Sequence, residues 1–219
     1  MARLIPQVTP AEIVNPNESM LAKSLISQLD SSVEVYHSFK CDDNLLNSEQ
    51  ISTESRGLTR YRDAADQIVI IDPANGMLLL DLKGGSLSYL EEADCWEQVF
   101  DNGRVRRMNK SPFDQLSRKM CALMEKMGKI KPFSEMERLP FACGYALVSP
   151  HSNKENIAFP MGTHLELLWD AAKCKDLKRS IQSVFDLWRR DFHVPLGTTE
   201  MEGVRKVLLS YLGLLPDGG

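Results

Sequence analysis

The sequence lacks the residue spacings that mark several common classes of protein. Its five cysteines are scattered and form no Cys-x-x-Cys pair, which argues against a structural zinc site. It has no glycine-rich phosphate loop of either standard type, so nothing indicates a nucleotide-binding enzyme. No stretch approaches the roughly 18 apolar residues of a membrane span, and residues 1–10 lack the apolar part of a signal peptide. We therefore expect a cytoplasmic protein with reduced thiols and no membrane partner.

Positive charge is scarce overall but concentrated in one segment. The formal net charge is −4, which argues against indiscriminate DNA binding. Residues 103–132 nevertheless carry nine basic side chains against two acidic ones. The basic residues are Arg104, Arg106, Arg107, Lys110, Arg118, Lys119, Lys126, Lys129 and Lys131. Such a segment suits a phosphate backbone, and the alternative is an ordinary solvated helix face.

The most informative segment, residues 66–85, has the pattern of two apolar strands joined by a tight turn at 73–76. Residues 68–71 and 77–80 are continuous apolar runs, typical of central strands that are covered on both faces. Asp66 precedes the first strand, and the second ends at Asp81 and Lys83. Gly84 and Gly85 follow, where a backbone or substrate can approach closely.

These charged residues are expected at one end of the hairpin. Side chains alternate between the faces of a strand, so Asp81 and Lys83 point the same way, and pairing brings Asp66 to the same end. Charges beside a covered strand are costly to desolvate unless they are paired or bind a cation. Two carboxylates and an ammonium there suit a Mg²⁺-dependent phosphodiesterase. The alternative is a set of solvated residues at strand ends.

Helices are predicted on both sides of the hairpin. The first opens at Asn15 and carries Glu18 in its first turn, where the helix dipole alone favours an acid. The second opens with Ser111 as N-cap and Pro112 at the first helical position. Gln115 lies one turn into that helix, where local capping is the alternative to a functional role.

Other elements are predicted around them. Residues 33–39 and 141–148 have strand patterns. An Asp-Asn-Gly turn typical of a hairpin lies between the segments 96–100 and 104–108. From residue 163 the pattern becomes helical, with apolar stripes over 165–172, 177–188 and 204–212. Thr198 or Thr199 is the expected cap of the last helix.

In order and spacing, these pieces resemble the nuclease-related domain (NERD) family, a branch of the PD-(D/E)xK restriction-endonuclease-like superfamily. The matching pieces are Arg3-Leu4-Ile5-Pro6, Asn15-Pro16-Asn17-Glu18, Asp66, Gly76 to Gly85, Trp96, Asn109 and Pro112-Phe113-Asp114-Gln115. The resemblance implies an α/β fold with a restriction-endonuclease-like mixed central sheet flanked by helices. It also implies hydrolysis of DNA. It assigns five site residues: Glu18, Asp66 and Asp81 as metal-associated acids, Lys83 as the catalytic lysine, and Gln115 as the helical polar residue that completes the site.

From this resemblance we expect Asp66 and Asp81, with the backbone carbonyl of Leu82, to hold Mg²⁺, for which Mn²⁺ can substitute. The residues expected to bind DNA are Arg104, Arg106, Arg107, Lys110, Arg118 and Lys119. The chain departs from the family pattern at Ala64 and Asp81, where members often carry Glu. The shorter carboxylate predicts a metal held closer to the strand backbone, or more weakly. The rival hypothesis is therefore a nucleic-acid-binding or protein-docking module whose site is catalytically weak or inactive.

The expected organisation is a NERD nuclease-like domain over residues 1–150, a helical C-terminal extension over 151–215 and a linker-like end at 216–219. Proteins that resemble this one often carry a superfamily-one DNA helicase after such a domain. We therefore expect an N-terminal piece of a longer protein, with a helicase domain as its partner. DNA repair and antiviral defence against foreign DNA both fit this expectation.

Overall fold

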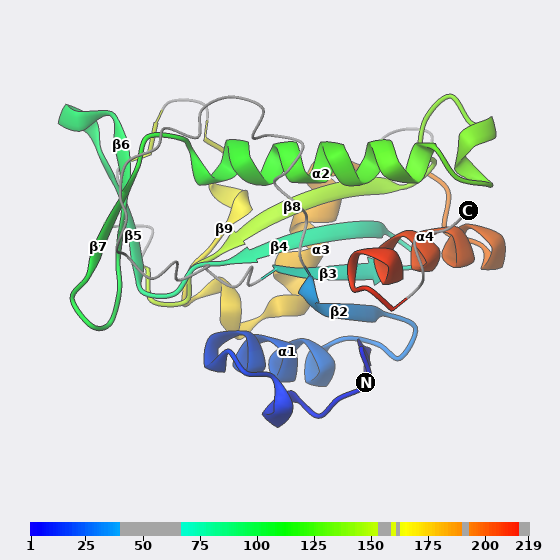
Figure 1. Ribbon diagram of the computed structural model, residues 1–219, viewed down its shortest axis with the longest axis horizontal. Coiled ribbons are helices and arrows are strands. Elements are labelled where there is room, and N and C mark those ends of the chain that lie inside the picture. The colour runs from blue at the N-terminus through cyan, green and yellow to red at the C-terminus, as the bar shows by residue number, and fades with distance from the viewer. Residues whose placement is uncertain (40–66, 153–158, 161–162, 190–192, 215–219) are drawn as a thin grey trace.

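The structure is a computed structural model that describes residues 1–39, 67–152, 159–160, 163–189 and 193–214. These residues form two sheets flanked by helices (Figure 1). The larger sheet comprises β1 (Arg3–Ile5), β2 (Glu34–Phe39), β3 (Gln67–Asp72), β4 (Gly76–Leu82), β8 (Ala142–Val148) and β9 (Leu168–Trp169), in that spatial order. The smaller sheet comprises β5 (Ser86–Leu90), β6 (Cys95–Val99) and β7 (Val105–Met108). The α-helices are α1 (Pro16–Gln28), α2 (Pro112–Gly128), α3 (Leu177–Trp188) and α4 (Thr198–Tyr211).

The larger sheet is mixed. β2, β3 and β4 form an antiparallel meander, while β1 runs parallel to β2. After the small sheet and α2, the chain returns to place β8 parallel to β4, and β9 adds parallel to the end of β8. The predicted α/β architecture, a mixed central sheet flanked by helices, is confirmed.

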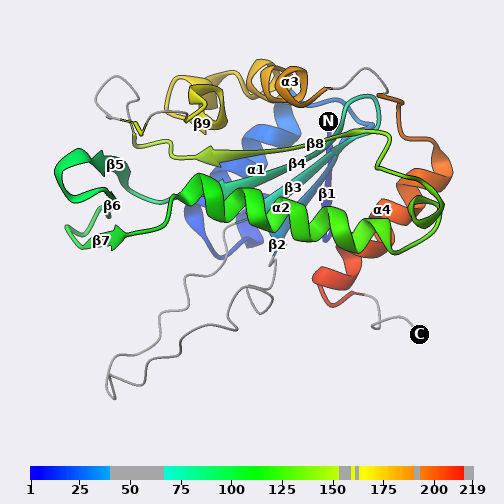
Figure 2. The same ribbon diagram turned by 90° about the horizontal axis from the view of Figure 1, so that it is seen from above.

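Helices cover both faces of this sheet, as Figure 2 shows from above: α1 and α3 on one face, α2 and α4 on the other. The alternation along β3 and β4 divides the core in two. Ile68, Ile70, Leu78 and Leu80 pack with α1 and α3. Val69, Ile71, Met77 and Leu79 pack with α2 and α4. All eight side chains are fully buried, as expected of strands covered on both sides.

The predicted hairpin is confirmed. β3 and β4 pair without interruption from Gln67 opposite Asp81 to Asp72 opposite Gly76. Asp72 closes the turn by accepting hydrogen bonds from Ala74 N at 2.9 Å and Asn75 Nδ2 at 2.7 Å. Gly76 has a φ of 127°, and a Cβ there would lie 2.1 Å from the carbonyl oxygen of Ala142, so only glycine fits.

The helix starts of α1 and α2 are also as predicted. The Asn15 side chain accepts hydrogen bonds from the amides of Asn17 and Glu18, and Ser111 accepts one from Phe113. None of the helices in the described ranges is long and apolar enough to cross a bilayer.

Two predictions for the C-terminal segment are wrong. The stretch 165–172 is not an α-helix: a 3-10 turn over Leu165–Leu167 leads directly into β9. Pairing of Leu168 and Trp169 with the end of β8 buries both side chains completely, which a helix exposed at the sheet edge would not do. The N-cap of α4 is Gly197, with Thr198 already inside the helix and no side-chain cap. The chain before it is fixed instead by a hydrogen bond from Leu196 N to Pro73 O at 2.8 Å.

A buried carboxylate joins the C-terminal helix to the first strands. Glu34 on β2 is 1% exposed, and Arg205 of α4 donates to it from Nε at 3.1 Å and from Nη2 at 2.7 Å. Tyr36 also donates at 2.8 Å, and Arg3 of β1 completes the cluster. Burial opposes ionisation of Glu34, but the hydrogen bonds from Arg205, Tyr36 and Arg3 outweigh it, so the pKa of this carboxyl is lowered. Helix α4 is thereby joined to β1 and β2.

We expect Glu34→Gln to lower the free energy of unfolding at pH 7 by about 2 kcal/mol, because it leaves the partly exposed Arg205 without its carboxylate. Folding lowers the pKa of Glu34, so its stabilisation is complete above the pKa of the unfolded carboxyl, about 4.3. That stabilisation is lost as the pH falls through the folded pKa. Urea unfolding of both proteins at pH 7 and pH 3 should show the difference shrinking at the lower pH.

The matched control is Asp30→Asn, which removes an ion pair with Lys178 whose side chains are 74% and 65% exposed. It should change the urea midpoint little at either pH. An equal loss from Glu34→Gln at both pH values would contradict the role given to its charge.

Candidate functional site

Segments far apart in sequence meet at one end of the larger sheet. β2, β4 and β8 end there, β3 begins there, and the first turns of α1 and α2 lie at the same end (Figure 1). Gln67 pairs with Phe39 on one side and with Asp81 on the other. A Cβ on Gly84 would lie 3.3 Å from the side-chain nitrogen of Asn17, so the start of α1 lies against the chain that leaves β4.

Asp81 and Lys83 form an ion pair at this end, with 3.0 Å between Oδ2 and Nζ. Asp81 is only 7% exposed, and the Lys83 side chain is 21% exposed. The prediction that both side chains point to one face is confirmed. The ammonium offsets the cost of taking the carboxylate out of water, directly beside a fully buried strand.

The pair lies on the face covered by α2. Asp81 continues the row of Met77 and Leu79, which pack against that helix. Gln115, in the first turn of α2, is therefore on the same face and at the same end. Its Nε2 donates to the carbonyl of Lys110 at 3.2 Å, and the described structure shows no hydrogen bond from it to Asp81. This bond to a carbonyl is not a cap of the free N–H groups of α2, which Ser111 supplies, and the functional role of Gln115 stays a prediction.

Glu18 reaches this end from the opposite face, on α1. It is 4% exposed and accepts a hydrogen bond from the backbone N–H of Ser38, which has a φ of 53° at an irregularity of β2. Burial raises the pKa of the Glu18 carboxyl, although the bond from Ser38 acts against it. Phe39, the next residue, is two strand spacings from Asp81, about 10 Å.

Asp66 lies outside the described residues, so its place in the site stays a prediction. Among the described residues, which omit it, no group of three or more His, Cys, Asp or Glu side chains could hold a metal ion. Leu82 is the last residue of β4, and metal binding by its carbonyl also stays a prediction. The carboxylate of Asp81 is a hard oxygen donor that fits Mg²⁺, and the rest of the predicted ligand set depends on Asp66.

The small sheet is anchored on the glycines that follow Lys83. Gln98 of β6 is 3% exposed and donates from Nε2 to the carbonyl of Gly84 at 2.7 Å. Ser149 donates to the carbonyl of Gly85 at 3.4 Å and shares a 2.7 Å hydrogen bond with Ser152. Only Gln98 could have been noticed in the sequence. It is a polar residue two positions after the apolar Trp96, so both lie on the same face of the predicted strand.

The basic residues lie beside this end. Arg104, Arg106, Arg107 and Lys110 are exposed on the small sheet and the approach to α2. On α2, Arg118 is exposed and Lys119 is half-buried. These residues thus belong to elements that meet at this end of the sheet, and their role at the Asp81–Lys83 pair stays a prediction. Contact of these residues with DNA stays a prediction.

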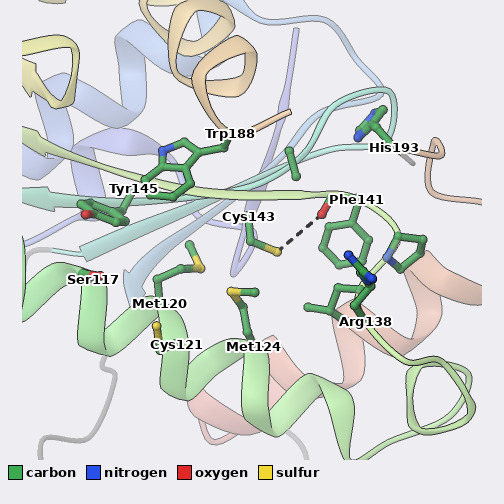
Figure 3. Close-up of a pocket in the computed structure, with 13 residues that line it drawn as sticks. Ser117, Met120, Cys121, Met124, Arg138, Phe141, Cys143, Tyr145, Trp188 and His193 are labelled. Carbon is green, nitrogen blue, oxygen red and sulfur yellow. Dashed lines mark hydrogen bonds between the residues drawn. The ribbon is translucent and has the colours of Figure 1, made fainter. Parts of the chain in front are cut away.

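A cavity of about 440 Å³ lies elsewhere, between α2 and β8. Figure 3 shows the side chains that line it. Met120 and Met124 line it from the helix, Cys143 and Tyr145 line it from the strand, and Trp188 closes it beside Tyr145. None of the predicted site residues lines this cavity.

In comparisons with known proteins, no family model, no curated protein and no solved structure matches this chain. The family resemblance of the sequence therefore stays a hypothesis.

We expect Gly85→Ala to destabilise the fold more than Gly103→Ala. Both glycines have a positive φ, so each alanine carries a similar backbone strain of about 1 kcal/mol. A Cβ on Gly85 would also lie 2.0 Å from the carbonyl oxygen of Val99, whereas nothing lies within 4 Å of one on Gly103. Backbone crowding should add roughly 2 kcal/mol to the loss at Gly85. Urea midpoints measure both, and equal losses would refute the close approach of the small sheet to this loop.

We expect Glu18→Gln to raise the urea midpoint at pH 7. Because the pKa of Glu18 is raised on folding, its ionised form disfavours the folded state once the pH exceeds the unfolded pKa. Glutamine keeps an acceptor for the Ser38 N–H and removes the charge. The gain should disappear near pH 3, where the carboxyl is protonated in both states. If Glu18→Gln instead lowers the urea midpoint at pH 7, the ionised carboxylate stabilises the folded protein and the expectation is wrong.

Proposed function

We propose that this chain is a metal-dependent nuclease domain of restriction-endonuclease-like fold that hydrolyses DNA phosphodiester bonds. The observation that carries the proposal is the buried Asp81–Lys83 pair, 3.0 Å apart at the end of the most buried hairpin of the sheet. A charged pair beside a covered strand does little for stability compared with apolar residues of similar size. Its position at a convergence of strand and helix ends favours a functional role instead.

Asp66 and Asp81, with the Leu82 carbonyl, would hold the metal. When bound, Mg²⁺ supplies polarisation of the scissile phosphate and lowers the pKa of a bound water. Hard carboxylate and carbonyl oxygens are the donors this ion prefers.

The other residues position and neutralise charge. Lys83, already held beside Asp81, orients the attacking water or offsets the negative charge that develops on the phosphate. Gln115 stands over the same face from the first turn of α2. Glu18, fixed by Ser38, supports the site from the opposite face. The basic residues around the small sheet draw the DNA backbone to this end.

The architecture agrees with the proposal. The resemblance implies a mixed central sheet with helices on both faces, and this chain has such a sheet, with Asp81 and Lys83 at the end of a central strand. A helicase domain in the same or a partner protein, with a role in DNA repair or antiviral defence, is part of the same proposal.

A second candidate is a nucleic-acid-binding or protein-docking module with a weak or inactive site. The observation that favours it is the same ion pair, in which Lys83 already neutralises Asp81 without any ligand. Ala64, at a position where the resembling family often carries an acid, points the same way.

We expect Asp81→Asn and Lys83→Ala each to reduce DNA cleavage at least 100-fold, because each removes a charged group placed at the reacting phosphate. Cleavage is measured on plasmid and on labelled duplex DNA with Mg²⁺ or Mn²⁺. Lys83→Ala leaves a buried carboxylate without its cation, so Lys83→Gln and circular dichroism separate lost chemistry from lost folding.

Lys178→Ala is the control, since that lysine is exposed on α3 and away from this end. Cleavage that survives both site substitutions would rule out the assignment. Binding of DNA by the unaltered chain without cleavage in Mg²⁺, Mn²⁺ or Ca²⁺ would favour the second candidate.

A further inference from the structure

The cavity between α2 and β8 is far larger than an ordinary packing defect. Its volume is about 440 Å³, whereas close-packed cores hold few voids larger than a water molecule. The core beside it is closed, since Leu116 and Leu123 of the same helix are fully buried. Sites for small molecules begin at about 300 Å³ and are lined mainly by apolar and aromatic side chains. Cys121 lines the space and is exposed to solvent, so a molecule can enter without unfolding the core.

The wall of the cavity along α2 is made of thioethers. Met120 and Met124 are one helical turn apart and point from α2 toward Cys143 on β8 (Figure 3). Methionine side chains fill irregular spaces and make favourable contacts with aromatic rings. Burial raises the pKa of the Cys143 thiol, which is therefore uncharged at neutral pH. This side of the cavity offers an adaptable, polarizable and uncharged surface.

The wall along β8 is made of two aromatic rings. Tyr145 of β8 and Trp188 of α3 have ring centroids 5.3 Å apart and ring planes tilted by 45°. A Cβ on Gly144 would lie 2.6 Å from the Trp188 ring, so the glycine lets the indole lie directly against the strand. Aromatic rings favour further rings in offset or edge-to-face arrangements. Both walls of the cavity therefore suit an aromatic ligand.

The polar side chains of the cavity select against charge. Figure 3 shows Ser117 and Tyr145 at one end and Arg138 at the other. None of the described residues that line the cavity is Asp or Glu, so a cation gains no partner there. The Arg138 side chain is 58% exposed and its guanidinium lies 4.0 Å from the Glu137 carboxylate, so it adds little attraction for an anion. The hydroxyl groups at the other end suit an uncharged polar group.

We propose that this cavity binds an uncharged, planar aromatic molecule between the methionines of α2 and the Tyr145–Trp188 pair. An apolar cavity of about 150 Å³ holds one benzene ring, so a space of about 440 Å³ has room for a fused pair of rings. The binding is independent of the nuclease assignment, because Asp81 and Lys83 do not line the cavity.

Binding is measured by isothermal titration calorimetry with three matched probes. Naphthol is the aromatic probe, decalol is its fully saturated analogue, and naphthylmethylamine is an aromatic cation. We expect naphthol to bind with a Kd of about 50 μM, a usual affinity for a ligand of this size. The other probes should bind roughly 10-fold more weakly, decalol because it lacks the ring contacts and the amine because its charge is desolvated without a partner.

Substitutions locate the bound probe. Met124→Trp fills the cavity and should abolish naphthol binding. The matched control is Met20→Trp, which should leave binding unchanged because Met20 is 69% exposed on α1, on the other face of the sheet. Tyr145→Leu should weaken naphthol binding by about 5-fold and leave decalol unaffected, whereas Tyr145→Phe keeps the ring and should keep the preference.

Thermal unfolding shows that each variant is folded at the temperature of titration, and Cys143→Leu replaces Met124→Trp as the filling change if the latter is unfolded. The proposed site is overturned if naphthol at about 1 mM, far above the expected Kd, does not bind the folded protein, or binds the filled variant equally well. Equal affinities for naphthol and decalol would overturn the aromatic class of the ligand. DNA cleavage by the same proteins reports separately on the nuclease assignment.

Discussion

The cost of removing a carboxylate from water organises one end of this molecule. β4 is fully buried from Met77 to Leu80, and Asp81 follows with no intervening polar residue. Such a charge needs a partner close by, and strand alternation provides one two residues later in Lys83. The glycines after Lys83 then let the small sheet approach closely enough for Gln98 to bond the Gly84 carbonyl.

Much of the main body was predictable because its signals are local. Apolar runs, the turn at Pro73 and the caps at Asn15 and Ser111 each act within a few residues, so the hairpin and two helix starts follow from the sequence. The 165–172 stretch shows the limit, since its helical spacing is overridden by pairing beside Val148. Whether this stretch forms a helix or a strand is decided only when β8 is in place to pair with it.

The site was predictable in part for the same reason. The Asp81–Lys83 pair depends on strand alternation and is confirmed. Glu18 reaches the same end from the opposite face of the sheet, which the sequence did not predict. Which face a helix covers depends on packing across the whole sheet, and no short motif encodes it. Gln98 and the Arg205–Glu34 cluster were missed because their contacts join distant parts of the chain, 171 residues apart in the latter case.

The border of the larger sheet at β8 has a consequence for self-association. In the described part of the chain, β9 pairs only with Leu147 and Val148, so the first half of β8 has β4 alone as a neighbour. Trp188 lies over that half: a Cβ on Gly144 would be 2.6 Å from its ring, and its centroid is 5.3 Å from that of Tyr145. An indole thus lies beside the part of the strand border that would otherwise be open to pairing, and bulky cover of this kind is one way in which an edge strand is protected.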